Sequence, residues 1–174
     1  MNQQLFANFA KLALIAAAGF AVDASATTAT DTFEVKMTIV AACDVTAGTS
    51  SDIDFSNVSS LQTNLTANNA ISVTCSKNTP YYIGLAPSNG DTTGAGLMSG
   101  LTAGNTDTVP YQLRSTSGIG GTIWGNTATS TDIGNGVGGI GNGAAQSMDV
   151  YATAPDANFT PDSYSDTVTV TVNY

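Results

Sequence analysis

The sequence contains no histidine. Histidine is the commonest general base in enzymes and the commonest metal ligand, so its absence counts against proton-transfer and metal chemistry. The serine and threonine hydroxyls have no histidine to activate them, and no nucleophile elbow is present. The composition therefore favours a protein that is not an enzyme and that needs no cofactor.

Positive charge is also scarce. The chain has four Lys and Arg residues against 13 Asp and Glu residues, a net charge of −9. After residue 26, only Lys36, Lys77 and Arg114 are positive. A surface of this sign repels nucleic acid and anionic membranes, so neither is an expected partner.

Long apolar runs are missing except near the N-terminus. There Lys11 precedes the apolar residues 12–22, and the small residues Ala24, Ser25 and Ala26 follow. This order predicts a secretory signal peptide over residues 1–26. The apolar run is about half of the ~20 residues that a membrane-spanning helix needs. We expect no membrane insertion and an exported chain of residues 27–174.

Cysteine occurs twice, at Cys43 and Cys75. In an exported protein such a pair predicts a disulfide, and zinc would need more ligands than this chain offers. We therefore expect the Cys43–Cys75 bridge and no metal site. Closing a loop of this length should stabilise the fold by about 3–4 kcal/mol.

Helical periodicity is absent, and alternation of apolar and polar residues replaces it. At the C-terminus, Val168, Val170, Val172 and Tyr174 share one face of a predicted strand, with Thr and Asn residues on the other. Short strands between Gly, Asn, Ser and Pro clusters predict an all-β sandwich of immunoglobulin type. Residues 115–145 are expected to form loops around a weak strand near Ile123 and Trp124. The other predicted strands are Ile53–Val58, Ala70–Ser76, Tyr81–Ala86, Val109–Arg114 and Gln146–Ala152.

A further alternating segment lies just ahead of Cys43. Its apolar residues are Phe33, Val35, Met37 and Ile39, and Glu34, Lys36 and Thr38 stand between them. This segment is predicted to be a strand with one apolar edge. Two interpretations stay open at this point. The strand can pair within its own sandwich, or it can fill an apolar groove beside the C-terminal strand of a second molecule.

Several motifs together resemble the spore coat protein U domain family, and within it the subunits of archaic (Csu-type) chaperone–usher pili. The resemblance covers nearly all of residues 27–174. It rests on the order and spacing of the alternating arm, Val40-Ala-Ala-Cys-Asp-Val45, Ile71-Ser-Val-Thr-Cys75, Val109-Pro-Tyr-Gln-Leu113, Trp124-Gly125, Asp149-Val-Tyr151 and Tyr164-Ser-Asp-Thr-Val-Thr-Val-Thr-Val-Asn-Tyr174.

This resemblance implies an incomplete immunoglobulin-like sandwich that lacks its final strand and is completed by donor-strand exchange. Residues 27–40 would be the donor arm, with Phe33, Val35, Met37 and Ile39 as donor side chains, and residues 41–174 the sandwich domain. The acceptor groove edge would comprise Val168, Val170, Val172 and Tyr174. Asp31 falls in the donor phase and fits an apolar pocket badly, so the upstream limit of the arm stays open.

The partners implied by the resemblance are identical or related pilus subunits, a periplasmic chaperone and an outer-membrane usher. The expected function is therefore a structural shaft subunit of a surface pilus for adhesion and biofilm formation, exported through the periplasm. One alternative is a monomeric secreted carbohydrate-binding module, in which the arm completes its own sheet. The other is a spore or cyst coat protein of the same fold.

Three patterns that imitate functional sites are interpreted as structural. The run Gly134–Gly143 contains a G-x-G-x-x-G pattern, but no helix follows it, so we expect a loop and no dinucleotide. The acid pairs Asp52 with Asp54 and Asp162 with Asp166 are interpreted as solvated surface groups rather than catalytic or calcium-binding carboxylates. Trp124 and the pair Tyr81-Tyr82 are candidates for sugar stacking, and for Trp124 a buried position is preferred.

Overall fold

Alternating sequence builds nine strands in the part of the chain that the computed structural model describes, which is residue 25 and residues 27–174. The predicted signal peptide, residues 1–26, lies outside the described residues except for Ser25. The elements are β1 (Cys43–Thr46), the 3-10 helix η1 (Thr49–Ser51), β2 (Thr63–Cys75), β3 (Pro80–Pro87), β4 (Ala95–Gly100), β5 (Thr108–Arg114), β6 (Val137–Ile140), β7 (Ala145–Asp156), β8 (Tyr164–Ser165) and β9 (Val168–Asn173).

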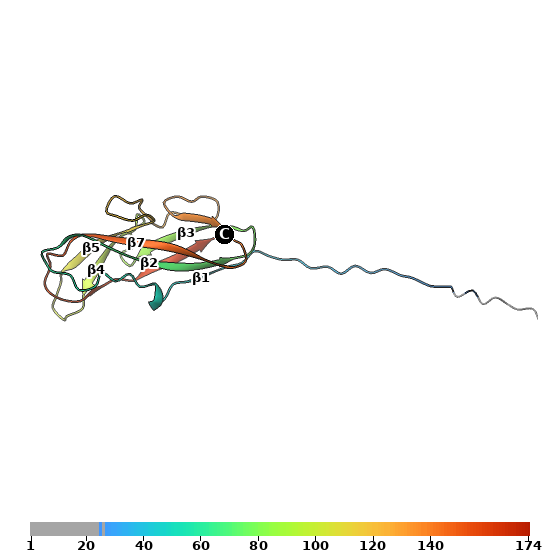
Figure 1. The fold of residues 1–174 in the computed structure, drawn as a ribbon, viewed down its shortest axis with the longest axis horizontal. Coiled ribbons are helices and arrows are strands. Elements are labelled where there is room, and N and C mark those ends of the chain that lie inside the picture. The colour runs from blue at the N-terminus through green and yellow to red at the C-terminus, as the bar shows by residue number, and fades with distance from the viewer. Residues whose placement is uncertain (1–24, 26) are drawn as a thin grey trace, which may run out of the picture. The chain divides into compact units, whose positions relative to one another are not determined.

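The strands form two sheets that pack as a sandwich (Figure 1). The first sheet has the order β1-β2-β7-β5-β4-β8, and the second has the order β6-β3-β9. All strand pairs are antiparallel. The predicted all-β sandwich is confirmed. Among the residues described, none belongs to a helix with the length and hydropathy of a membrane span.

Both sheets contribute to the core. Val73 of β2, Ile83 of β3 and Leu113 of β5 are almost completely buried. Trp124 lies among them with 1% of its surface exposed, and its Nε1 donates a hydrogen bond to the Ile83 carbonyl oxygen at 2.8 Å. A buried indole with a satisfied N–H is a structural residue, so the buried position preferred for Trp124 is confirmed.

The disulfide between Cys43 and Cys75 is present, as predicted. It joins the first residue of β1 to the last residue of β2, two positions that face each other across the antiparallel pair. The bridge therefore holds a four-residue edge strand against the neighbouring strand, which is 13 residues long.

Most predicted strands occur within longer observed ones. Residues 70–75 lie in β2, residues 81–86 in β3, residues 109–114 in β5 and residues 146–152 in β7. The weak strand expected near Ile123 is a single bridge between Ile123 and Arg114. Residues 33–40, predicted as a strand, have no regular secondary structure in the single chain.

The predicted strand Ile53–Val58 is wrong, although its alternation is real. Ile53 and Phe55 are half-buried and pack on the core, yet the segment makes no ladder with a sheet. Asn69 of β2 donates its side-chain amide to the carbonyl oxygens of Ser50 and Asp52 at 3.0 and 2.7 Å. The Asn69 side chain therefore makes hydrogen bonds that a paired strand would otherwise make with the start of this segment. Ser56, which has a φ of 62°, then turns the chain.

The glycine-rich run is also different from the prediction, because Val137–Ile140 forms strand β6 and pairs with β3. A Cβ on Gly138 would lie 2.8 Å from the ring of Tyr82, and one on Gly139 would lie 2.5 Å from the Tyr81 hydroxyl. The glycines let β6 approach two tyrosine rings, so the middle of the run is a close-packed strand, while residues 134–136 and 141–143 lie outside it.

Strand β4 was not predicted, because its two glycines lower its β propensity. Gly96 pairs with Tyr111, and a Cβ at Gly96 would meet the Tyr111 ring at 2.1 Å. The Tyr111 hydroxyl donates to Asp166 at 2.7 Å, so the ring cannot move without losing this bond. We expect Gly96→Ala to lower the free energy of unfolding by about 1–3 kcal/mol in urea titrations. Gly120→Ala, where a Cβ meets nothing within 4 Å, is the neutral control.

Candidate strand-acceptor site

Strand β9 is an edge strand of the three-stranded sheet. It pairs with β3 from Tyr82–Asn173 to Pro87–Val168, and within the described residues no strand pairs with its other edge. An open edge presents unpaired N–H and C=O groups and is a template for a further strand. β9 ends at Asn173, so Tyr174 of the predicted groove edge lies beyond the strand and is 52% exposed.

The core is only partly covered at this edge. Val170 and Val172 face inward from β9 and pack on the core, but they are half-buried. Their partners on β3, Leu85 and Ile83, are 1% and 0% exposed. Because the two strands carry apolar residues of similar size in the same layer, the difference arises from the missing neighbour of β9. The predicted groove valines thus lie where a further strand would cover them.

Strand β1 forms the other side of this opening. It is the edge strand of the six-stranded sheet, and it approaches β9. Val45 of β1 is half-buried. Ile53 and Phe55, which follow it in the chain, are also half-buried and pack on the core. We call the half-buried row Cys43, Val45, Ile53, Phe55, Val168, Val170 and Val172 the open strip.

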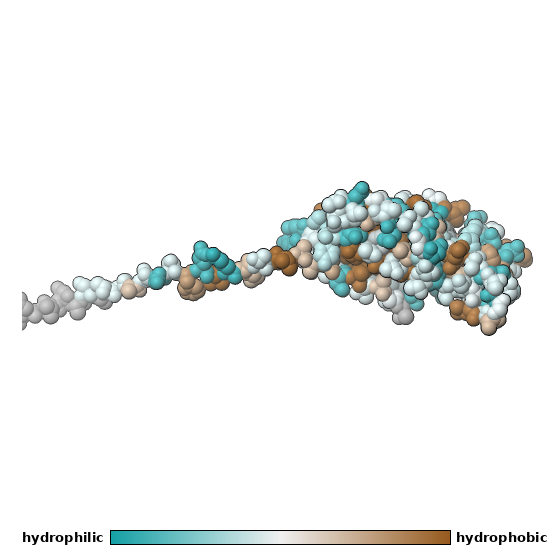
Figure 2. Space-filling view, turned by 180° about the vertical axis from the view of Figure 1, so that it is seen from behind, coloured by the Kyte–Doolittle hydropathy of each residue, from teal (hydrophilic) through white to brown (hydrophobic). Residues whose placement is uncertain are grey.

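The place of Ile53 and Phe55 in the open strip was not predicted, although their alternation with Asp52 and Asp54 indicated that they share an inward face. Figure 2 shows brown apolar patches that interrupt the polar surface of the body.

The segment that precedes the sandwich has the complementary pattern. Phe33, Val35, Met37 and Ile39 are 83–88% exposed, and residues 27–42 form no strand. Between the apolar residues, the Lys36 ammonium pairs with the Glu34 carboxylate on the polar side. The predicted donor side chains are therefore exposed and belong to no strand.

The segment is attached firmly where the sandwich begins. The Ala42 N–H donates to Ser76 Oγ at 3.0 Å, and the Ala42 carbonyl oxygen accepts from the Ser76 N–H at 2.9 Å and from Ser76 Oγ at 3.2 Å. Sequence reasoning did not identify Ser76, because an isolated serine at a strand end carries no distinguishing pattern. The chain is therefore held to the sandwich from Ala42 onward.

Asp162 and Asp166 are both held by hydrogen bonds within the fold. Asp162 accepts hydrogen bonds from the Thr102 N–H, Thr102 Oγ1 and Asn105 Nδ2 at 2.7–2.9 Å, and these donors hold the pKa of the carboxyl far below its usual range. Burial raises the pKa of Asp166, but hydrogen bonds from Ser88 and Tyr111 outweigh it and leave the pKa lowered. In the described part of the chain, no three His, Cys, Asp or Glu residues gather as metal ligands do. Asp162 and Asp166 therefore tie loops together.

The stability of the fold is expected to fall in acid, because several of its carboxylates accept hydrogen bonds. Hydrogen bonds lower the pKa of Asp91, Asp107 and Asp162 in the fold below the value of about 3.9 expected in the unfolded chain. Their contribution to stability is therefore complete above that value and is lost as the pH falls below it. We expect a constant Tm from pH 7 to 5 and a decline below about pH 4 in calorimetry. Asp162→Asn should flatten the decline, whereas Asp149→Asn, at an exposed position of β7, should not.

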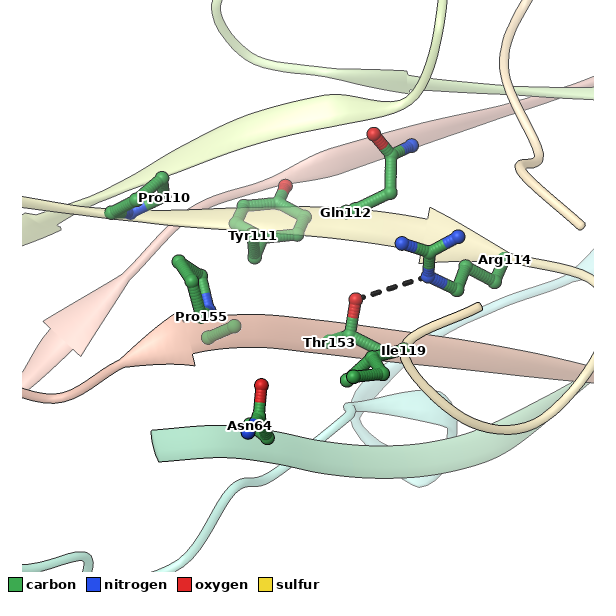
Figure 3. A pocket seen from close by; sticks show the side chains of 9 residues that line it. Asn64, Pro110, Tyr111, Gln112, Arg114, Ile119, Thr153 and Pro155 are labelled. Carbon is green, nitrogen blue, oxygen red and sulfur yellow. Dashed lines mark hydrogen bonds between the residues drawn. The ribbon is translucent and has the colours of Figure 1, made fainter. Parts of the chain in front are cut away.

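The positions considered for sugar stacking do not form a platform. Tyr81 is 2% exposed, and Tyr82 is half-buried against Gly138. A pocket of about 330 Å³ lies over β5 and β7 and is lined by Pro110, Ile119 and Pro155 (Figure 3). Within it, Arg114 Nε donates to Thr153 Oγ1 at 3.1 Å and Nη1 donates to the Gly121 carbonyl oxygen. Arg114 thus fastens the loop that carries Ile119.

Comparison with solved structures gives a similar fold. In the CsuC–CsuE chaperone–tip adhesion subunit pre-assembly complex from the archaic chaperone–usher Csu pili of Acinetobacter baumannii, one chain matches with a TM-score of 0.52 and 22% sequence identity. The match covers 79% of this chain and 40% of the length of that chain. This likeness concerns the fold. The comparison with curated proteins gave no match.

The sequence comparison is more specific. The model of the Spore Coat Protein U domain matches residues 29–171, which include most of the exposed arm and nearly all of the sandwich. Such a match extends over the arm, the disulfide, the buried Trp124 and most of β9. The chain therefore belongs to the Spore Coat Protein U domain family.

Proposed function

We propose that this protein is a structural shaft subunit of an archaic chaperone–usher pilus and that it polymerises by donor-strand complementation. The observation that carries the proposal is the complementarity between the open strip and the exposed apolar side of the arm. Phe33, Val35, Met37 and Ile39 of one subunit would cover the open strip of the next. Addition of a strand at the free edge of β9 supplies main-chain hydrogen bonds along its length.

Docking of the arm balances apolar burial and main-chain hydrogen bonding against the cost of ordering the arm. Each large apolar side chain that becomes buried contributes about 1.5–3 kcal/mol, and the arm supplies four. Ordering the arm opposes this by about 1–2 kcal/mol for each residue fixed. Apolar contacts and main-chain hydrogen bonds to β9 must together exceed that cost. The whole arm must therefore dock, because one side chain alone contributes too little.

The proposed partners follow from the same exposed features. A subunit with an open apolar strip would aggregate during export, so we propose a periplasmic chaperone that covers it and an outer-membrane usher that exchanges the chaperone for the next arm. Identical or related subunits then form the fibre at the cell surface, where it would support adhesion and biofilm formation. The family and the fold likeness support this assignment.

Electrophoresis of the exported protein tests the proposal. Fibres joined by docked strands should resist detergent at room temperature, so unboiled samples should run as a ladder and boiled samples as one band. Deletion of residues 27–40 should abolish the ladder and leave only the monomer band. A single monomer band from the unboiled wild type contradicts polymerisation and favours a monomeric secreted module. Immunogold labelling of spores or cysts rather than of surface fibres would support the coat role.

A further inference from the structure

We propose a second function for the disulfide: it transfers tension from the arm to the centre of the sandwich. The source of this tension rests on the proposed function, because in a fibre each subunit is pulled through its own arm and through the groove that holds its neighbour's arm. The position of the bridge in the chain carries the inference. Cys43 is the first residue of β1 and directly follows Ala42, whose backbone is hydrogen-bonded to Ser76.

Without the bridge, tension on the arm would act on a weak element. β1 has four residues, lies at a sheet edge and pairs only with β2 among the described strands. The Ala42–Ser76 hydrogen bonds and the β1 ladder would be the first to carry the load. A short edge strand with few hydrogen bonds is the kind of element that opens locally before the rest of a domain.

The segment behind β1 offers little further resistance. The turn between Gly48 and Ser51 is closed by one backbone hydrogen bond of 2.7 Å, and Asn69 supplies two hydrogen bonds to the carbonyl oxygens of Ser50 and Asp52. Ile53 and Phe55 are only half-buried. Once β1 is detached, residues up to Gln62 would leave the body in succession, and the β1 side of the open strip would be lost with them.

With the bridge, the load bypasses this segment. The covalent link passes tension from Cys43 to Cys75, which is 1% exposed and ends the longest strand of the sheet. β2 pairs with β7 from Thr63 to Thr74, so the load is spread over a long row of hydrogen bonds and buried side chains such as Val73. The bridge thus keeps the open strip intact in a subunit under tension.

Single-molecule stretching of the full exported chain tests this function. Handles are attached ahead of Phe33 and at Asp149, an exposed position of β7, which has a neighbouring strand on each side. The oxidised wild type should show no lengthening before the whole domain unfolds. Cys43→Ser with Cys75→Ser should show an early lengthening of about 7 nm, the reach of residues 43–62 at roughly 3.5 Å per residue. An early step in both proteins, or in neither, overturns the proposal.

Two further experiments separate load transfer from general stability. Handles at the exposed Lys77 and at Asp149 bypass the bridge, so here the double variant should show no early step. An early step with these handles contradicts the proposal. If the double variant does not fold, wild type that is folded oxidised and then reduced under low tension provides the same comparison. Stretching uses single molecules and needs no fibre. The load-transfer proposal can therefore be contradicted while the detergent ladder persists, and it can be supported where no ladder forms.

Discussion

The full chain carrying Met37→Asp is expected to fold and to form no polymer. Met37 is 83% exposed in the single chain and belongs to no sheet, so the substitution should leave the stability of the sandwich unchanged. In a docked arm the same position faces the open strip of the next subunit. The exchange removes about 1.5–3 kcal/mol of apolar burial. It also places a carboxylate against apolar surface, which costs several kcal/mol more.

Lys36→Asp is the matched control, because it places the same charge one residue away on the polar side of the arm. The substitution loses the exposed ion pair with Glu34, and such pairs contribute about 0–1 kcal/mol. The ladder of unboiled samples should persist for Lys36→Asp and disappear for Met37→Asp. Equal effects of the two substitutions would contradict the phase assigned to the arm, and the predicted donor residues would then be wrong.

The second large effect is expected at the acceptor side. Val170→Asp places a carboxylate in the middle of the open strip, between Val168 and Val172. In the single subunit this position is half-buried, so water can still reach the new charge. In the fibre the neighbour's arm would cover it, and burial of an unpaired charge costs several kcal/mol. We expect Val170→Asp to abolish the ladder.

Thr171→Asp is the control for this variant, since Thr171 is exposed on the opposite side of the same strand. It should assemble as the wild type does. The fluorescence of Trp124, the one tryptophan in the chain, reports whether each variant retains a dry core. If Val170→Asp does not fold, Val170→Thr provides a milder change of nearly the same shape, for which a weakened but detectable ladder is expected. If Val170→Asp and Val170→Thr both assembled as the wild type does, β9 would not be part of the groove.

A mixture of the two variants sharpens both predictions. Met37→Asp retains an intact open strip, and Val170→Asp retains an intact arm. Each alone should stay monomeric, whereas co-expression should yield dimers and nothing longer, because only one productive pairing exists. Long ladders from the mixture, or no dimers at all, would show that donor and acceptor have been assigned to the wrong segments.

Strands were predictable from the sequence wherever one face is buried and the other is wet. The alternating valines and threonines of β9 and the inward residues of β2, β3, β5 and β7 produce a period of two that a sheet requires. The two cysteines of an exported chain likewise predicted their own bridge, because they have no alternative partner in the sequence. In these segments the local pattern and the packed environment agree.

The predictions failed where a tertiary contact replaces the side-chain signal. β6 is glycine-rich because the rings of Tyr81 and Tyr82 occupy the space that its side chains would fill. β4 carries Gly96 because the ring of Tyr111 crosses it. Ile53 and Phe55 alternate as a strand does, but Asn69 supplies the hydrogen bonds that a ladder would have provided.

The sequence by itself determined the class of this protein: an all-β chain, joined by one disulfide, with an alternating arm ahead of it. Alternation is a local property, so it shows that the arm has an apolar side but not what that side contacts. Only the tertiary structure decided that Phe33, Val35, Met37 and Ile39 stay exposed while Val170 and Val172 are incompletely covered. Burial depends on which strands become neighbours. Among the described strands β9 pairs only with β3, and no pattern within β9 could reveal that its other edge is open.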